Sequence, residues 1–215
     1  MLDETQHAND FVVDRSGLDF AVAAPARPGR AEAEEAVRTL IRFLGDDPAR
    51  EGLRQTPARV VRAYKEWFAG YDQDPDAILR RTFGEVGGYD DIVVLRDIPL
   101  ESTCEHHMAP IRGRVHIAYM PSQRVVGISK LARLVEAYGR RLQIQERLTA
   151  EIADALNRVL CPRGVAVVID AAHECMSSRG VRTHGASLIT RAFRGIYEAD
   201  GPRQDVMTLL QSQAR

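Results

Sequence analysis

Two pairs of predicted β-strands enclose two predicted helices in this chain, and few folds accommodate that order. The strands show alternating or continuous apolar residues, and the helices show apolar residues spaced three and four apart. In chain order we expect strands at 91–95 and 114–120, helices at 129–139 and 143–159, and strands at 165–169 and 186–193. Two hairpins flanking two helices indicate an α+β fold, an antiparallel sheet with both helices on one face. The two open edges of such a sheet favour a homo-oligomer in which neighbouring copies pair with them.

Two more helices are predicted ahead of this pattern. One fits residues 31–44, and the other begins with Thr56 as its N-cap and Pro57 at its first helical position. Residues 1–29 have no sustained periodicity and end in a stretch rich in Ala and Pro, which indicates a flexible arm. We therefore divide the chain into this arm and one domain at 30–215. Within the domain we expect a helical part at 30–88, a core at 89–200 and a C-terminal tail at 201–215.

Composition narrows the classes of partner. With 215 residues, 45% of them hydrophobic and 27% charged, the chain resembles an ordinary globular protein. Its formal net charge is −1 and only 6% of its residues are aromatic, which argues against a nucleic-acid partner bound by stacking. The acidic N-terminus lacks the order of a signal peptide, and no apolar run is long enough to span a bilayer. We expect a cytoplasmic protein without nucleic-acid or membrane partners.

Two short clusters contain residues that bind metal ions. Cys104 and His107 are three apart, a spacing that lets one turn present a thiolate and an imidazole to the same ion. His173 and Cys175 point the same way if their segment is extended, so Cys175 is a candidate third ligand. Three such ligands suit Zn²⁺ and leave one tetrahedral position open for water, as in a catalytic site. The alternatives are ordinary buried residues, or a closed structural zinc site with His106 or His173 as fourth ligand.

A second candidate site binds anions. Ser129, Lys130 and Arg133 surround the first turn of a predicted helix, where free backbone N–H groups and the helix dipole attract negative charge. Neither familiar glycine-rich phosphate motif is present. Further candidates for phosphate binding are Arg59, Arg62, Arg179 and Arg182. For any one of these arginines taken alone, a solvated surface position is the more ordinary interpretation.

Glu146 is the third candidate. It lies off the apolar stripe of its helix, and a carboxylate can accept the two N–H donors that a guanine edge presents. The alternative is that an acidic residue near a helix N-terminus simply interacts favourably with the helix dipole.

Together these clusters resemble the GTP cyclohydrolase I family. The matching stretches, in the family's order, are residues 56–59, 102–107 (Ser-Thr-Cys-Glu-His-His), 127–133, 143–149 and 173–181 (beginning His-Glu-Cys). The resemblance implies a tunnelling fold, ββααββ, preceded by an N-terminal helical segment. It also implies a toroidal homodecamer with active sites at subunit interfaces, and one Zn²⁺ per subunit held by Cys104, His107 and Cys175.

The activity that the resemblance implies is the first step of folate and pterin biosynthesis. A zinc-bound water opens the imidazole ring of GTP at C8, formate leaves, and an Amadori-type ribose rearrangement and ring closure give 7,8-dihydroneopterin triphosphate. His106 and His173 are expected to move protons, and Glu146 with Gln145 to hold the guanine edge. The residues expected at the ribose and triphosphate are Ser129, Lys130, Arg133, Arg179 and Arg62.

One segment departs from the family pattern. Residues 182–191 are often rich in threonine in the family, and here they have fewer hydroxyls and more charged groups. Two alternatives to the family activity remain open: a hydrolase that opens the ring without completing the rearrangement, and a zinc-stabilised scaffold without catalysis. The scaffold predicts a fourth protein ligand at the metal, whereas the enzyme predicts an open position.

Overall fold

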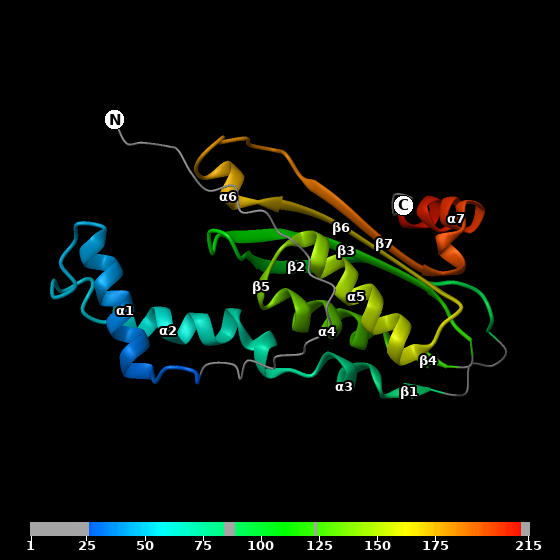
Figure 1. Ribbon diagram of the computed structural model, residues 1–215, viewed down its shortest axis with the longest axis horizontal. Helices are drawn as coiled ribbons and strands as arrows, with labels where there is room; N and C mark the ends of the chain where they lie inside the picture. The colour runs from blue at the N-terminus through cyan, green and yellow to red at the C-terminus, as the bar shows by residue number, and fades with distance from the viewer. Residues whose placement is uncertain (1–25, 84–88, 123, 212–215) are drawn as a thin grey trace, which may run out of the picture.

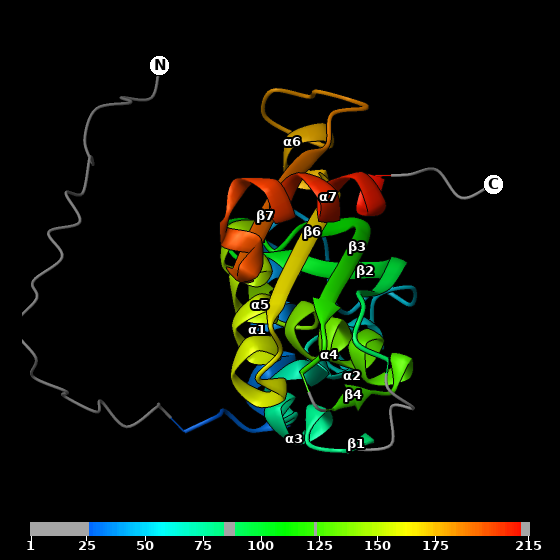
Figure 2. The same cartoon turned by 90° about the vertical axis from the view of Figure 1, so that its right-hand side faces the viewer.

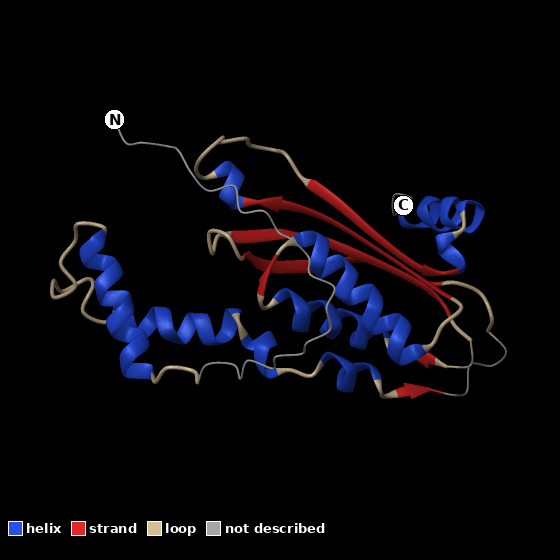
Figure 3. Cartoon of the chain, viewed as in Figure 1, coloured by secondary structure: helices blue, strands red, loops and turns tan. Residues whose placement is uncertain are grey.

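The chain folds around one curled, mostly antiparallel sheet with helices on both faces (Figures 1 and 3). The computed structural model describes residues 26–83, 89–122 and 124–211, so most of the predicted arm lies outside the described residues. The helices are α1 (Arg30–Phe43), α2 (Thr56–Trp67), α3 (Pro75–Leu79), α4 (Ile128–Gly139), α5 (Gln145–Leu160), α6 (Glu174–Ser177) and α7 (Asp200–Gln211), with 3₁₀ turns at η1 (Ala69–Asp72) and η2 (Ile196–Glu198). The strands are β1 (Thr82–Phe83), β2 (Val93–Cys104), β3 (Pro110–Met120), β4 (Val125–Val126), β5 (Leu142–Gln143), β6 (Gly164–His173) and β7 (Leu188–Gly195).

The main sheet has the strand order β5-β2-β3-β6-β7. β2, β3, β6 and β7 pair antiparallel, and the two-residue β5 pairs parallel to the end of β2. Ile111 of β3 pairs with His173, while Met120 pairs with Gly164 at the opposite end. Cys104 and His173 therefore lie at the same end of the sheet, with β3 between their strands. The short β1 and β4 form a separate two-stranded ribbon.

The two faces of the sheet are covered by different helices. α4 and α5 pack on one face, where the predicted stripe of Leu148, Ile152 and Leu156 is fully buried against strand residues such as Ile117. The other face packs against α7 through a smaller apolar cluster that includes Val206 and is distinct from the main core. Figure 2 shows α7 across the sheet from α4 and α5. The residues expected to form a C-terminal tail are therefore helical as far as 211 and cover the face that the sequence pattern left bare.

Every predicted strand and helix has a counterpart in the structure, but three of the predicted strands are too short. β2 extends to Cys104 because Ile98, Leu100, Ser102 and Cys104 alternate inward. The pairing register shifts between Leu95 and Ile98, and this bulge interrupts the alternation that predicts a single strand. β3 begins at Pro110 rather than at residue 114, and β6 likewise continues to His173.

The sequence-based predictions for where three helices start are wrong. Gln55 rather than Thr56 is the N-cap of α2, and Gly127 rather than Ser129 is the N-cap of α4. The two hydroxyl residues that suggested caps, Thr56 and Ser129, lie inside the first turn of their helices, and neither helix start has a side-chain capping hydrogen bond. α5 begins at Gln145, since 142–143 form β5. Among the described residues no helix has the length and apolar character needed to cross a membrane.

Candidate metal centre and active site

Three side chains that can bind a metal ion converge at one end of the sheet. The Sγ atoms of Cys104 and Cys175 and a ring nitrogen of His107 all lie within 4.8 Å of one another. Cys104 is buried, Cys175 is half-buried and His107 is exposed. Two thiols and one imidazole are a donor set suited to Zn²⁺, so these residues fit the predicted ion. Among the residues that the structure describes, neither His106 nor His173 belongs to this group, and three protein donors are the number found in catalytic zinc sites.

The turn after β2 brings Cys104 and His107 together. The backbone N–H of Cys104 donates to the Ala109 carbonyl oxygen at 2.8 Å, and the Cys104 carbonyl accepts from the Met108 N–H at 2.8 Å. Met108 adopts a left-handed backbone conformation, with φ of 52°, as the chain reverses. The Cys-x-x-His spacing therefore acts through a tight turn anchored on the last residue of a strand.

Cys175 reaches the group by a route different from the predicted one. β6 ends at His173 and Glu174 begins α6, so the segment is helical rather than extended. The backbone N–H and the hydroxyl of Ser178 both donate to the Glu174 carbonyl oxygen, at 2.9 and 2.6 Å, and close this single turn. Burial and the adjacent Cys104 thiol raise the pKa of Cys175. A bound cation would oppose this rise in the pKa, because it stabilises the Cys175 thiolate.

His173 lies next to the metal group at the end of β6. Its Nε2 is 2.8 Å from Oε1 of Gln145, the first residue of α5. Burial lowers the pKa of His173, and the nearby Glu146 carboxylate opposes that shift. On another side of the group, a guanidinium nitrogen of Arg179 lies 3.0 Å from Nε2 of His107. The metal group therefore lies beside the half-buried imidazole of His173 and the positive charge of Arg179.

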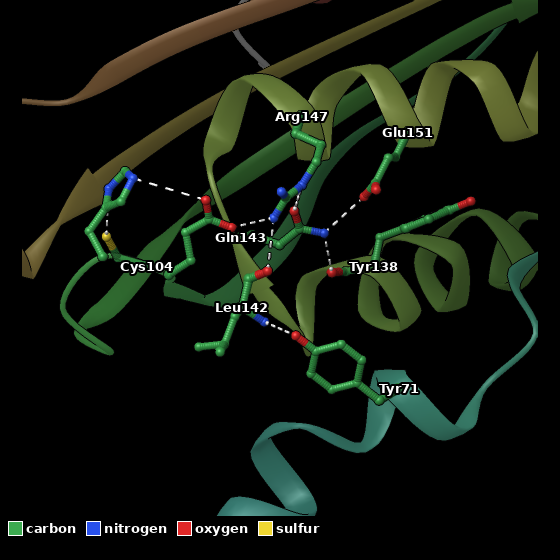
Figure 4. Close-up of polar contacts among 9 residues, drawn as sticks. Tyr71, Cys104, Tyr138, Leu142, Gln143, Arg147 and Glu151 are labelled. Carbon is green, nitrogen blue, oxygen red and sulfur yellow. Dashed lines mark hydrogen bonds and ion pairs between the residues drawn. The ribbon is translucent and has the colours of Figure 1, made fainter. Parts of the chain in front are cut away.

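His106 stands on the turn beside a short series of charged side chains. Its Nδ1 is 3.9 Å from Sγ of Cys104, and its Nε2 is 4.0 Å from Oε1 of Glu105. The other carboxylate oxygen of Glu105 accepts from Arg147 of α5 at 2.5 Å. Arg147 also donates from Nε to Oε1 of Gln143 at 3.1 Å (Figure 4). The turn that presents the histidines is thereby tied to the helix behind it.

Gln143 is the centre of this network, and sequence reasoning did not identify it. Only 2% of its surface is exposed, and its Nε2 donates to the Tyr138 carbonyl at 3.1 Å and to the Glu151 carboxylate at 2.9 Å. Beside it, the backbone N–H of Leu142 donates to the Tyr71 hydroxyl at 3.1 Å (Figure 4). Gln143 lies within residues 143–149, one of the stretches that match the family pattern. Its partners come from α4 and α5, and the spacing of residues in the sequence does not indicate these contacts.

Comparison with known proteins places the chain in a family. The family model described as GTP cyclohydrolase I matches residues 33–211. The chain belongs to the GTP cyclohydrolase I family. It is 56% identical over 193 residues to GTP cyclohydrolase 1 of Maricaulis maris (strain MCS10), covering 89% of this chain and 94% of that protein. It is 60% identical over 174 residues to GTP cyclohydrolase 1 of Hyphomonas neptunium (strain ATCC 15444), covering 81% and 84%. GTP cyclohydrolase 1 of Sinorhizobium fredii (strain NBRC 101917 / NGR234) is 54% identical over 186 residues, covering 86% and 91%.

The structure separates the residues that the GTP cyclohydrolase I family pattern assigns to substrate. Glu146 is exposed in the first turn of α5, at the metal end of the sheet. Ser129, Lys130 and Arg133 stand at the start of α4, which follows β3 and β4 at the opposite end. α4 has 12 residues, a length of about 18 Å, and its last residue precedes β5 beside Cys104. Within one chain the anion-binding helix start and the metal group are therefore far apart.

The other two predicted phosphate ligands also differ in position. Arg179 lies at the metal group, where it contacts His107. Arg62 is exposed on α2, which extends from the metal end of the molecule (Figure 1). Gln145, predicted at the guanine edge, is buried with 1% of its surface exposed. Of the residues predicted to bind substrate, Arg179 and Glu146 therefore lie at the metal end of the chain, whereas Ser129, Lys130 and Arg133 lie at the opposite end.

Proposed function

We propose that this chain is a zinc-dependent enzyme that converts GTP and water into 7,8-dihydroneopterin triphosphate and formate. The observation that carries the proposal is the three-donor group of Cys104, His107 and Cys175 beside His173, in a chain of the GTP cyclohydrolase I family. The reaction would begin at C8 of the guanine imidazole ring and end with an Amadori-type rearrangement and ring closure. A tunnelling fold is the corresponding architecture, and the antiparallel-rich sheet with α4 and α5 on one face supports it.

The metal group would hold one Zn²⁺ through Cys104, His107 and Cys175. When bound, the ion supplies Lewis acidity and activates water near neutral pH. His173 would move a proton at a ring nitrogen of the guanine while the five-membered ring opens, since C8 is a weak electrophile and ring opening needs an acid as well as a nucleophile. His106, exposed on the turn, would exchange protons with solvent during the same steps.

Substrate binding would use both ends of the sheet. The Glu146 carboxylate would accept N1–H and the 2-amino group of guanine, which fixes the ring beside His173. Lys130, Arg133, Arg179 and Arg62 would bind the triphosphate, and Ser129 the ribose. Because the start of α4 lies about 18 Å from the metal end of its own chain, we infer that Ser129, Lys130 and Arg133 come from a neighbouring copy, whereas Arg179 comes from the chain that holds the metal group. That arrangement fits a homo-oligomer, a toroidal decamer with active sites between subunits.

A direct assay tests the activity. The purified, zinc-loaded protein is incubated with GTP, the product is oxidised with iodine in acid, and neopterin fluorescence and formate are measured. Equal amounts of formate and pterin support the proposal. Formate without pterin indicates a hydrolase that stops after ring opening. A folded, zinc-loaded sample that yields neither product refutes the proposal.

One substitution separates the enzyme from the zinc-stabilised scaffold. In the enzyme, His173→Ala keeps its zinc and loses turnover by roughly 10²- to 10⁴-fold, the usual contribution of general acid–base catalysis. In the scaffold, His173 is a fourth ligand and its removal weakens zinc binding. Zinc content by atomic absorption, measured beside the activity of the same sample, distinguishes the two.

Mixing two inactive variants tests the shared site. Lys130→Ala and His173→Ala damage groups at opposite ends of a chain, so hybrid assemblies would contain some sites with both groups intact. Co-refolded mixtures should regain part of the activity that either variant lacks alone. Activity that stays at the level of the separate variants, in assemblies shown to be mixed, would exclude a site between copies.

A further inference from the structure

The Gln145 side chain is enclosed by protein groups. It belongs to the first turn of α5 and reaches between β6 and β7. Its Nε2 lies 3.2 Å from the Ile169 carbonyl oxygen, 2.8 Å from the Leu188 carbonyl oxygen and 3.1 Å from the Thr190 hydroxyl. An amide nitrogen has two hydrogens, so these three acceptors already use its donor capacity. A guanine edge could bind to Nε2 only if these bonds were given up.

Two threonines fix which way the amide points. The Thr149 hydroxyl donates to the Gln145 backbone carbonyl at 2.6 Å, which uses its only hydrogen. The Thr149 and Thr190 hydroxyl oxygens are 2.6 Å apart, so Thr190 must be the donor in that pair. Thr190 is then left as an acceptor for Nε2 of Gln145. A flipped amide would set Oε1 against the two strand carbonyl oxygens, acceptor against acceptor.

The fixed amide determines the state of the histidine. Oε1 of Gln145 lies 2.8 Å from Nε2 of His173, and an amide oxygen can only accept. We infer that Gln145 is a positioning residue, which orients the His173 imidazole and keeps its hydrogen on Nε2. In the neutral ring, Nδ1 is then the nitrogen without a hydrogen, and it has no hydrogen-bond partner within the described part of the chain. This inference rests on the proposed function, in which His173 moves a proton at the guanine ring.

A positioning role and direct guanine binding predict different kinetics. Gln145→Met keeps the length of the side chain and removes its hydrogen bonds. If Gln145 orients His173, kcat falls by roughly 10- to 100-fold while KM for GTP changes by less than about threefold, because the lost interaction matters in the transition state. If Gln145 binds guanine directly, KM rises and kcat is retained. The second result would overturn the inference.

Thr190 provides a matched pair of variants for the case in which Gln145→Met does not fold. Thr190→Val removes the hydroxyl that accepts from Gln145 at nearly unchanged volume, and it should lower kcat less than Gln145→Met does. Thr190→Ser retains the hydroxyl and should restore most of the lost kcat. Leu156→Ala, at a fully buried position about three turns beyond Gln145 on α5, controls for lost stability and should leave kcat unchanged. Equal kcat for the Val and Ser variants would contradict the inference.

A measurement independent of turnover completes the test. Solid-state ¹⁵N NMR of histidine-labelled, zinc-loaded protein at about pH 8, where an ordinary imidazole is neutral, reports which ring nitrogen carries the hydrogen. His173→Asn identifies the signals of His173. We expect a hydrogen on Nε2 in the wild type and a mixture of tautomers in Gln145→Met. A hydrogen on Nδ1 in the wild type overturns the inference. If the wild type forms no pterin, the proposed function fails and the NMR result still decides the role of Gln145.

Discussion

Replacing Gln143 by leucine tests whether the buried polar network behind the metal end stabilises the fold. The substitution keeps the approximate volume of a side chain that has 2% of its surface exposed. It removes three hydrogen bonds: to the Tyr138 carbonyl at 3.1 Å, to Glu151 at 2.9 Å and from Arg147 at 3.1 Å. At about 1 kcal/mol of net stability each, the loss is about 3 kcal/mol. Leucine regains part of this through its apolar surface, which leaves a net cost of about 2 kcal/mol.

The assay is thermal unfolding followed by circular dichroism, at one fixed protomer concentration because association contributes to apparent stability. For a chain of this length, a cost of about 2 kcal/mol corresponds to a fall of roughly 4–8 °C in Tm. Gln204→Leu on the exposed surface of α7 is the control and should stay within about 0.5 kcal/mol of wild type. Zinc content should not change, since Arg147 keeps its bonds to Glu105 and to the Leu142 carbonyl. A Gln143→Leu protein as stable as wild type would refute the reasoning.

Three further predictions address the metal, the sheet and pH. Cys175→Ser should bind zinc at least 10-fold more weakly than wild type, measured by competition with a chelator, because a thiolate ligand is lost. Gly113→Ala should lower stability by about 1–3 kcal/mol in thermal unfolding, because the added Cβ would lie 2.1 Å from the Asp170 carbonyl oxygen of the paired strand. Burial lowers the pKa of His116 from its ordinary 6.5, so the unfolded chain takes up a proton first as pH falls. The contribution of His116 to the free energy of unfolding is complete above about pH 6.5 and is lost as pH falls from there through the lower folded pKa. His116→Gln should flatten this part of the plot of unfolding free energy against pH, and an unchanged slope would contradict the prediction.

The sequence could predict what depends on local periodicity. The apolar stripe of α5 is buried as the spacing of Leu148, Ile152 and Leu156 indicated, because a helix shows its buried face in a single stretch of chain. The end of β2 was missed because the bulge beside Asp97, which has a φ of 59°, breaks the alternation of inward residues. A bulge is set by pairing with β3, and one strand alone does not reveal it.

In the candidate site too, the sequence predicted contacts between near neighbours in the chain better than contacts that depend on strand pairing. Cys104 and His107 are neighbours in sequence, so their convergence follows from a turn. Cys175 joins them although the predicted extended geometry was wrong, because pairing of β6 with β3 brings its segment to the same end of the sheet. Gln145 was assigned to the guanine edge, and its contacts with the distant Thr190 became visible only in the fold. The roles assigned to the substrate-binding residues stay predictions.

The positions of the two thiols have a consequence for biosynthesis. Cys104 ends β2 and Cys175 follows β6, two strands that never pair with each other because β3 lies between them. Neither a β2–β3 hairpin nor a β3–β6 pair alone assembles the donor group. β6 must therefore have been synthesised, and both the β2–β3 and the β3–β6 pairings must have formed, before a chain can bind an ion in this geometry. If the group binds zinc as proposed, metal uptake would come late in folding, and zinc uptake during refolding would report that both pairings are complete rather than that the sheet has nucleated.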